Sequence, residues 1–373
     1  MLGIEGERLG SIFGKMFRVT TFGESHNLGV GVVVEGTPAG IPLSVRDIQK
    51  ELERRRPGRT VISSPRKELD RVEILSGVFE GKTIGTPIAM LIRNVDVNSR
   101  PYEAIKDRPR PGHADLTYFL KYGHVDWRGG GRASGRETVA RVAAGAVAKK
   151  FLSEHGIEVL GHTVEAAGIK VEKEVGFEEI KKYSDKNSMR CADPEVARRM
   201  ERAVLAVAKE GDSTGGIVEV RAIGVPPGLG DPIFDKLDAE IAHAMMSIGA
   251  IKAVEIGAGT KFARMRGSEA NDPITIEGGK ITISTNNSGG ILGGISVGAP
   301  IIVRLTVKPT PSISLPQHTV NIRKMKETMI ELKGRFDPNI CPRVVPVAEA
   351  MLAIVLADHM LRSGKAKPDR VGG

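Results

Sequence analysis

The sequence predicts a mixed α/β fold of the α+β type, in which antiparallel sheets are combined with a few long helices. Short β-branched runs such as 30–35 and 88–92 are bounded by Gly and Pro. Several such runs follow one another without a helix between them, and this arrangement favours antiparallel pairing. Two apolar segments, 134–156 and 347–359, have the residue spacing of buried helices.

In the N-terminal part, the expected strands are Val30–Glu35, Val72–Val78 and Ile88–Ile92. The segment Ser44–Arg56 is expected to be a helix, because Ser44 is a suitable N-cap and Asp47 stands in the first turn. Ile48 and Leu52 give this helix an apolar face, and Pro57-Gly58 ends it.

In the rest of the chain, the expected strands are Ile217–Val225, Ile281–Ser284 and Ile301–Lys308. Ser134 can cap a long helix with Glu137 three residues further on, and small apolar residues continue this helix to near Gly156. A second long helix is expected from about Val347 to His359, ending before Gly364.

The length of 373 residues fits two to three domains or one large α/β unit, and no repeat or linker divides it, so we expect one domain over residues 1–373. The longest uncharged run, 281–303, contains many polar residues and glycines, which excludes a transmembrane helix. The N-terminus lacks the apolar segment of an export signal. Cys191 and Cys341 are too far apart for a zinc motif or a disulfide framework, so we expect a cytoplasmic protein without a metal site.

The net charge of +9 and the pI of about 9.5 predict an anionic partner. Only 4% of residues are aromatic, so platforms for stacking nucleic-acid bases are scarce. The basic residues occur in short Arg-dense loops rather than in a tail. This pattern favours a small polyanionic substrate or cofactor, with a basic nucleic-acid-binding protein as the alternative.

The best candidate for an anion site is the segment Arg128–Glu137, where glycines and three arginines lead into the predicted 134–156 helix. Backbone N–H groups at a helix start and guanidinium groups both bind phosphate. A flexible turn and an RGG-type RNA segment are the alternatives. Two common nucleotide motifs are excluded, because Gly77–Thr83 is one residue too short for a P-loop and no G-x-G-x-x-G follows a strand.

Arginines at the end of the 44–56 helix indicate a second anion site. The helix dipole favours cations there, but Arg54, Arg55 and Arg56 cannot all cap one helix. We therefore expect at least one of them to face a phosphate or a carboxylate.

Two histidines in Gly-flanked polar loops, His26 and His113, are candidate general acids. A solvated or locally hydrogen-bonded histidine is the alternative for each. The loop Lys308–Ser312 offers a cation and hydroxyls after a strand, and Gly334–Pro338 pairs Arg335 with Asp337, a candidate base.

The most distinctive segments are 22–26 (FGESH), 54–58 (RRRPG), 110–115 (RPGHAD), 128–138, 246–248, 254–257, 286–294, 308–310 (KPT) and 335–338 (RFDP). In this order, from about Ser11 to about Leu361, they resemble the chorismate synthase family. The resemblance implies a helical layer between two antiparallel sheets, an internal pseudo-duplication, a homotetramer, and a C-terminal tail at 362–373.

The resemblance also implies a carbon–oxygen lyase of the shikimate pathway, which eliminates phosphate from 5-enolpyruvylshikimate 3-phosphate to give chorismate. Reduced FMN is the implied cofactor, although the reaction has no net redox change. NADPH and an external flavin reductase are the candidate sources of electrons. Neither nucleic acid nor a membrane is an expected partner. A flavin reductase without lyase activity is a second alternative.

By position, the resemblance assigns three groups of site residues. The implied catalytic residues are His26 near flavin N1 and C2, His113 as proton donor near the leaving phosphate, Asp337 in proton transfer at flavin N5, and the hydroxyls of Ser25 and Ser134. The implied substrate-binding residues are Arg55, Arg59, Arg110 and Arg136. The implied flavin-binding residues are Arg132, Ala133, Ser134, Gly249, Ala250, Gly293, Lys308, Pro309, Thr310, Pro311, Ser312 and Arg335.

Three positions depart from the family pattern. Asn27 stands where Gly or Cys is usual, and Asn suits that turn if the backbone has a positive φ. Asn339 replaces a small residue, and Val61 replaces an arginine for which Arg59 is the nearest substitute.

Overall fold

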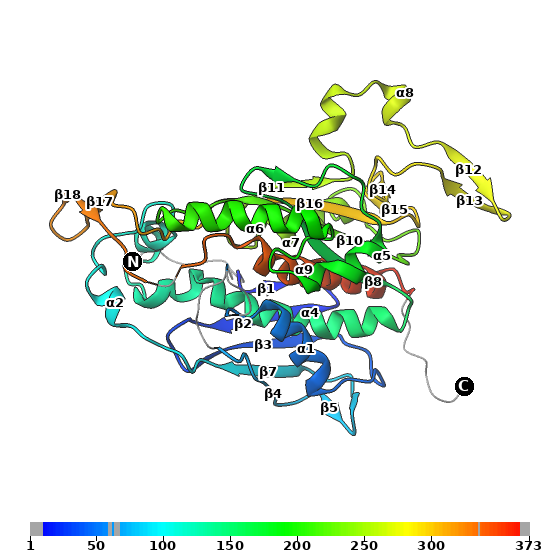
Figure 1. Cartoon of the computed structure of the whole chain (residues 1–373). Helices are drawn as coiled ribbons and strands as arrows, with labels where there is room; N and C mark the ends of the chain where they lie inside the picture. Colours follow the sequence, from blue (N-terminus) through cyan, green and yellow to red (C-terminus); the bar gives the residue numbers. More distant parts are fainter. Residues whose placement is uncertain (1–9, 59–61, 63–67, 335, 366–373) are drawn as a thin grey trace.

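The computed structural model describes residues 10–58, 62, 68–334 and 336–365, and it contains two five-stranded antiparallel sheets on either side of a layer of helices (Figure 1). The first sheet has the strand order β1 (Ile12–Phe13), β2 (Arg18–Gly23), β3 (Gly29–Glu35), β7 (Ile88–Arg93) and β4 (Val72–Ile74). The second has the order β11 (Ile251–Ile256), β16 (Ile301–Val307), β10 (Gly216–Ile223), β8 (Glu158–Ala166) and β9 (Ile169–Lys170). The predicted α+β class and layer order are confirmed.

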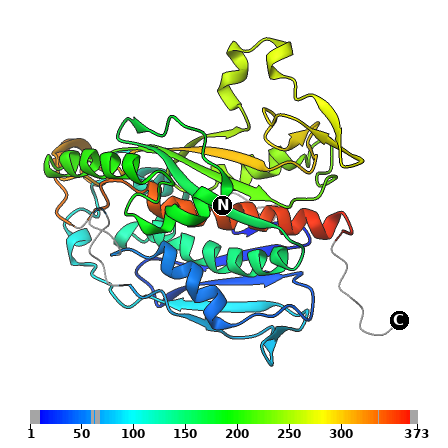
Figure 2. The ribbon, with the colours of Figure 1, turned by 45° about the vertical axis from the view of Figure 1, so that its right-hand side comes forward.

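The middle layer contains α1 (Val45–Arg55), α4 (Thr138–Ser153), α7 (Leu237–Met246) and α9 (Cys341–Arg362). The two long helices, α4 and α9, lie side by side between the sheets (Figure 2). α4 packs on β2 and β3, whereas α9 packs on β8 and β10. Both helices are apolar around most of their circumference because they are covered on several sides. One core therefore runs from Val32 in the first sheet to Val220 in the second.

The two halves of the chain repeat one order of elements. Apart from short hairpins and outer helices, the first half reads β1, β2, β3, α1, β4, β7, α4 and the second reads β8, β9, β10, α7, β11, β16, α9. In both sheets, the third, fifth and fourth strands of the series are neighbours in that order. They are β3, β7 and β4 in the first sheet, and β10, β16 and β11 in the second. This repetition is the predicted internal pseudo-duplication.

The other elements lie around these layers. On the outer side of the second sheet, α5 (Phe177–Tyr183), η3 (Ser184–Lys186) and α6 (Pro194–Lys209) enclose a small second core against β8 and β9. The short helices are α2 (Arg100–Glu103), α3 (Asp115–Tyr122), η1 (Arg128–Ala133), η2 (Gly135–Glu137), η4 (Gly259–Arg264) and α8 (Gly267–Ala270). The hairpins are β5–β6 (Val78–Phe79, Lys82–Thr83), β12–β13 (Ile274–Glu277, Lys280–Ile283), β14–β15 (Ile291–Leu292, Ile295–Ser296) and β17–β18 (Gln317–Asn321, Lys326–Ile330). The P-loop-like segment is thus hairpin β5–β6.

The predicted helices are present, with differences at their starts. Ser44 and Asp47 form a capping box at the start of α1, as the sequence predicted. Ser134 caps the 3₁₀ turn η2, and α4 follows directly from Thr138. α9 begins six residues before the expected Val347, because the prolines at 342 and 346 obscure the helical pattern of its first turns.

Within the described residues, α9 is the helix that is long and apolar enough to cross a membrane by length and composition. Its most apolar window is 94% buried inside the fold. The apolar composition of α9 therefore reflects its position between α4 and the second sheet.

A buried cluster of charges joins three helices and the second sheet. Glu349 of α9 has no exposed side-chain surface and accepts hydrogen bonds from Arg54 Nη2 (2.8 Å), Lys149 Nζ (2.6 Å) and the Gly161 amide (2.8 Å). Burial alone would raise the pKa of Glu349, but the charges of Arg54 and Lys149 outweigh it and lower the pKa to about 2. Of the three consecutive arginines 54–56, the first therefore has a structural role.

The close packing of α4 against α9 depends on a glycine. A Cβ atom at Gly145 would lie 2.2 Å from Ala350 Cβ and 2.5 Å from Ala350 Cα. Gly145→Ala is expected to destabilise the fold by about 1–3 kcal/mol because of overpacking, although alanine has the higher helix propensity. Thermal unfolding checks this, with Gly267→Ala as a control because a Cβ atom there meets nothing within 4 Å. Equal unfolding midpoints for the two variants would contradict the close packing.

Candidate active site

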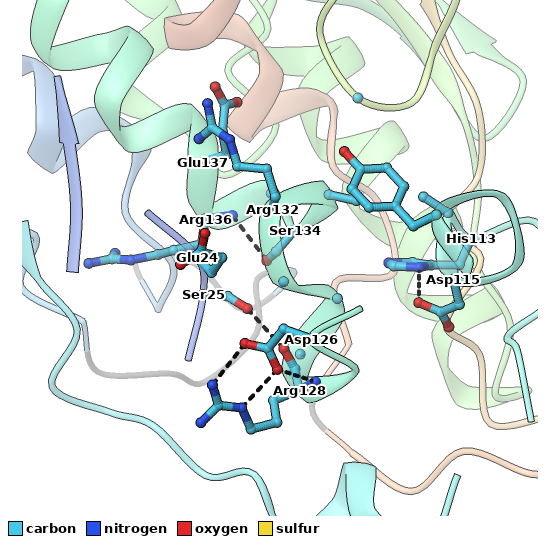
Figure 3. Close-up of a pocket in the computed structure, with 18 of the residues that line it drawn as sticks. Glu24, Ser25, His113, Asp115, Asp126, Arg128, Arg132, Ser134, Arg136 and Glu137 are labelled. Carbon is cyan, nitrogen blue, oxygen red and sulfur yellow. Dashed lines mark hydrogen bonds and ion pairs between the residues drawn. The ribbon is translucent and has the colours of Figure 1, made fainter. Parts of the chain in front are cut away.

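A cavity of ≈ 1540 Å³ lies where α4 and α9 begin, and Thr138 and Arg343 from their first turns line it (Figure 3). Pockets for one small ligand usually measure about 300–1000 Å³, so this cavity has room for two ligands. The predicted site residues that line it are Ser25, His26, Arg55, Arg110, His113, Arg132, Ala133, Ser134, Arg136, Gly249, Ala250, Lys308, Thr310, Pro311, Ser312 and Asp337. These residues come from both halves of the duplicated fold.

Some predicted residues are not among the lining. Arg59, Val61 and Arg335 lie outside the described residues. Pro309 is part of the 308–312 loop without lining the cavity itself. Gly293 lies in the β14–β15 turn, and its neighbour Gly294 accepts a hydrogen bond from the Leu237 amide at the start of α7. Gly249 and Ala250 follow the other end of α7, about 15 Å along the helix. Gly293 is therefore not among the described residues that line this cavity, and its role in flavin binding stays a prediction.

The glycine loop 129–131 lies between the two candidate acids. All three glycines have a positive φ, between 54° and 90°. A Cβ atom at Gly129 would lie 2.4 Å from His26 Nε2, and one at Gly130 would lie 2.8 Å from His113 Cε1. Glycine is required here because the backbone passes this close to both imidazole rings.

His113 is held by a carboxylate and an arginine. Its Nδ1 lies 2.6 Å from Asp115 Oδ1 and 3.2 Å from Arg110 Nη2. Arg110 also donates to Asp115 through Nε (2.7 Å) and Nη2 (2.8 Å), and its side chain is buried. Burial alone would raise the pKa of Asp115, but the hydrogen bonds from Arg110 and His113 lower it well below the usual range. Arg110, predicted to bind substrate, thus also holds the Asp115 carboxylate.

The other predicted polar residues near the glycine loop, His26, Ser25 and Ser134, are hydrogen-bonded to neighbouring residues. His26 Nδ1 lies 2.7 Å from Ser99 Oγ, and its ring meets Tyr102 edge to face. Ser25 Oγ donates to the Arg128 carbonyl (3.3 Å), and Ser134 Oγ accepts from the Arg136 amide (3.2 Å). These contacts suit hydrogen-bonding roles for both serines rather than a nucleophilic role.

Three arginines concentrate positive charge at one end of the cavity. Arg55 Nη1 lies 2.9 Å from Asp70 Oδ2, and Arg136 shares the same carboxylate. Burial, together with the nearby Arg343 and Arg136, lowers the pKa of Arg55 to about 10, while Asp70 opposes this shift. Arg343 Nη1 lies 2.5 Å from Asp337 Oδ2. Glu68 Oε2 lies 3.9 Å from Arg136 Nη2, so three carboxylates face these three guanidinium groups. Arg132 and Lys308 also line the cavity and add the positive charge that suits it to a multiply charged anion.

The residues predicted for the flavin fit a cofactor that carries phosphate. Arg132 Nη1 and Thr310 Oγ1 are buried and have no hydrogen-bond partner among the described residues. The Lys308 amide donates to the Ala250 carbonyl (2.9 Å), which brings the segments 249–250 and 308–312 together. Ala250 has a φ of 73°, an uncommon conformation for alanine that is often found at ligand sites. Burial and the nearby Lys252 lower the pKa of Lys308.

Sequence reasoning missed several residues that contact the predicted ones, among them Ser99, Tyr102, Asp115 and Arg343. Arg343 had a detectable signal, because it stands in the first turn of α9, where the helix dipole disfavours a cation. A cation at such a position indicates that a partner other than the helix holds it. Ser99 and Tyr102 lie more than seventy residues from His26 and carried no such signal.

Two family departures have structural explanations. Asn27 is not among the positive-φ residues, so this turn does not use the left-handed conformation that asparagine tolerates. Its Oδ1 accepts from Arg128 Nη2 (3.1 Å), and its Nδ2 donates to Glu24 (2.5 Å). Asn339 is buried, with Oδ1 accepting from the Cys341 amide (2.9 Å) at the start of α9 and Nδ2 donating to Thr214 Oγ1 (3.0 Å). Both asparagines therefore stabilise the loops that carry the site.

Comparison with known proteins agrees with this geometry. The family model described as chorismate synthase matches residues 17–361. The chain is 59% identical over 359 residues to a chorismate synthase of Methanosarcina mazei, covering 96% of this chain and 98% of the relative. It is 56% identical over 359 residues to a chorismate synthase of Chloroflexus aurantiacus, covering 96% and 97%. A crystal structure of chorismate synthase superposes with a TM-score of 0.76 at 38% identity, covering 94% of this chain and 93% of the other. The chain therefore belongs to the chorismate synthase family.

Proposed function

We propose that this cavity catalyses the chorismate synthase reaction, the 1,4-elimination of phosphate from 5-enolpyruvylshikimate 3-phosphate. The chain is accordingly a carbon–oxygen lyase of the shikimate pathway and of aromatic amino acid biosynthesis. The observation that carries the proposal is the gathering of two histidines, an aspartate and several arginines around one cavity. A substrate with one phosphate and two carboxylates requires this excess of positive charge.

The cofactor side of the cavity is formed by residues 132–134, 249–250 and 308–312. The buried, unpartnered Arg132 Nη1 and Thr310 Oγ1 supply donors for the polar groups of FMN. Reduced FMN, when bound, supplies electron density to the substrate as phosphate leaves. Arg335 belongs to the same proposed set but lies outside the described residues.

The substrate side is formed by the arginines. Arg55, Arg136 and Arg343 surround Asp70 and Asp337, and guanidinium groups bind phosphate and carboxylate through paired N–H donors. The first turns of α4 and α9 add partial positive charge from two helix ends. An anion bound here relieves the mutual repulsion of the three guanidinium groups.

Two proton-transfer roles follow from the side chains. His113 donates the proton on Nε2 to an oxygen of the departing phosphate, because its Nδ1 edge is held by Asp115. The Asp337 carboxylate, oriented by Arg343, takes up the proton that originates at C6 of the substrate. His26, Ser25 and Ser134 hydrogen-bond to the bound ligands and to the loop, and so orient both.

An anaerobic assay tests the proposal directly. With chemically reduced FMN and 5-enolpyruvylshikimate 3-phosphate, chorismate and free phosphate should appear in equal amounts, and only when reduced flavin is present. Oxidation of NADPH without any need for the phosphorylated substrate, and without formation of chorismate, would instead indicate a flavin reductase. Salt-sensitive binding of any nucleic acid without flavin binding would indicate a nucleic-acid-binding protein.

Asp337→Asn is expected to slow the chemical step by about 10²–10⁴-fold, because an amide cannot take up the proton. Single-turnover kinetics with reduced FMN measures this step apart from binding and product release. Asp212→Asn, an exposed aspartate outside the cavity lining, is the control. Unaltered single-turnover rates in the Asp337 variant would remove Asp337 from the mechanism.

The proposal includes a cytoplasmic homotetramer of single-domain subunits, as the family resemblance implies. Light scattering of the purified protein measures the oligomeric state. NADPH and an external flavin reductase are both compatible sources of reduced flavin, and the anaerobic assay with NADPH in place of chemically reduced FMN separates them.

A further inference from the structure

We propose that Asp115 is a positioning residue for His113, which fixes the tautomer and the direction of the imidazole ring during proton transfer. The inference rests on the proton-donor role proposed for His113. Asp115 lies in the first turn of α3, where a carboxylate also stabilises the helix N-terminus. The contacts of both its oxygen atoms indicate the additional role.

The two edges of the His113 ring face different surroundings. On one edge, Nδ1 is 2.6 Å from Asp115 Oδ1 (Figure 3). On the other edge, a Cβ atom at Gly130 would be 2.8 Å from Cε1 and 3.1 Å from Nε2, so this edge faces the glycine loop of the cavity. Asp115 therefore binds the ring edge that is turned away from the glycine loop. Nε2, on the opposite edge, is left directed to the ligand side.

The carboxylate itself is fixed by Arg110. Its Oδ2 accepts from the Arg110 amide (3.1 Å) and from Arg110 Nε (2.7 Å), while Oδ1 accepts from Arg110 Nη2 (2.8 Å) as well as from His113. The Arg110 side chain is 6% exposed and Nη1 also contacts Ser312 Oγ (3.5 Å). Because every bond to Asp115 comes from an N–H donor, the carboxylate must stay ionised and accept through both oxygens.

This arrangement favours loss of the proton on Nε2 of His113 and retention of the proton on Nδ1. In the doubly protonated ring, Nδ1–H points at Asp115 and Nε2–H at the ligand side. When Nε2 transfers its proton to the phosphate oxygen, the neutral ring that remains carries its proton on Nδ1, which is the tautomer that Asp115 accepts from. The charged groups facing the ring are Asp115, Arg110 and, through its contact with the Gly112 carbonyl, Lys308.

An asparagine at position 115 cannot reproduce these contacts, because it offers one acceptor oxygen where the structure uses two. If that oxygen faces the two Arg110 donors on the Oδ2 side, the amide NH₂ faces His113 Nδ1 and stabilises the opposite tautomer, with the proton on Nε2. Asp115→Asn is therefore expected to lower kcat with reduced FMN by about 100-fold, with a smaller change in KM.

The decisive readout is independent of turnover. Ring ¹⁵N shifts of histidine-labelled protein report which nitrogen carries the proton, and His113→Ala identifies the His113 signals. We expect an Nδ1–H ring in the wild type at alkaline pH and an Nε2–H ring in Asp115→Asn. Glu178→Gln removes an exposed first-turn carboxylate from α5 without a histidine beside it, and should change neither the spectrum nor kcat.

The outcomes distinguish a failure of the positioning role of Asp115 from a failure of the proposed function. If His113→Ala is impaired but Asp115→Asn keeps wild-type kcat and the wild-type tautomer, the inference is wrong and the proposed function stands. If His113→Ala is fully active, the proton-donor role fails, whatever the spectrum shows. A loss of kcat in Asp115→Asn with an unchanged His113 spectrum would reduce Asp115 to a helix-stabilising residue.

Discussion

Replacing His113 by alanine is expected to lower turnover by about 10²–10⁴-fold, the usual contribution of a positioned general acid. Phosphate must then leave without a proton from Nε2, whereas the segments proposed to hold FMN are not altered. Affinity for the flavin, measured by fluorescence titration, should remain nearly unchanged. The expected split between turnover and cofactor binding is what distinguishes a proton donor from a residue that shapes the pocket.

His318→Ala provides the control for this experiment, because His318 is exposed on β17 and does not line the cavity. It should retain wild-type turnover. An unchanged rate in His113→Ala would exclude His113 as the proton donor. His26, on the other side of the glycine loop, would then be the remaining candidate acid.

The largest expected effect on stability comes from Glu349→Gln, which should lower the free energy of unfolding by about 3–5 kcal/mol. The substitution removes the fully buried carboxylate that Arg54 and Lys149 share, and among the described residues leaves them only Glu51 and Asp185, which are both more exposed. Thermal unfolding measures the loss, and Glu154→Gln at the exposed end of α4 is the control. A quadruple variant with apolar residues at 51, 54, 149 and 349 should recover much of the stability, because Glu51 also pairs with Arg54 and Lys149 and must be replaced with them.

The same cluster predicts a pH dependence. The folded-state pKa of Glu349, about 2, lies below its ordinary value of 4.5, so its contribution to stability is fully present above pH 4.5 and is lost as the pH falls towards 2. The wild-type protein should therefore lose more stability than Glu349→Gln over this interval. Parallel acid-unfolding curves for the two proteins would show that Glu349 is not ionised in the native state.

Local signals predicted much of the fold. Ser44 and Asp47 indicated the start of α1, and Ser134 correctly marked the entry to α4, because a capping side chain satisfies N–H groups a few residues away. The start of α9 was missed, since Pro342 and Pro346 interrupt the pattern from which a helix is inferred. Layer order depends on contacts between distant residues, such as Gly145 with Ala350, and came from the family resemblance alone.

For the site, too, the sequence predicted features that depend on neighbouring residues but not contacts that depend on the three-dimensional arrangement. Loops rich in Gly and Arg indicated anion binding, and the structure places Arg55, Arg132 and Arg136 at one cavity. The sequence could not show that Arg54 turns instead to Glu349, because neighbouring residues on a helix point to different sides. Nor could it show that Asp115 contacts His113 through one oxygen and Arg110 through both, since this depends on the turn that precedes α3.

The repeated order of elements has an evolutionary consequence. The loops that lead into α4 and α9 occupy equivalent positions in the two halves, and both line the same cavity, one with Arg132 and Arg136 and the other with Asp337. Either half alone would expose the face of its long helix that now packs on the other half. A half-length ancestor would thus have required a second copy both to fold and to complete a pocket. Fusion of the two copies then allowed the equivalent loops to diverge, one supplying Arg132 and Arg136 and the other the Asp337 carboxylate.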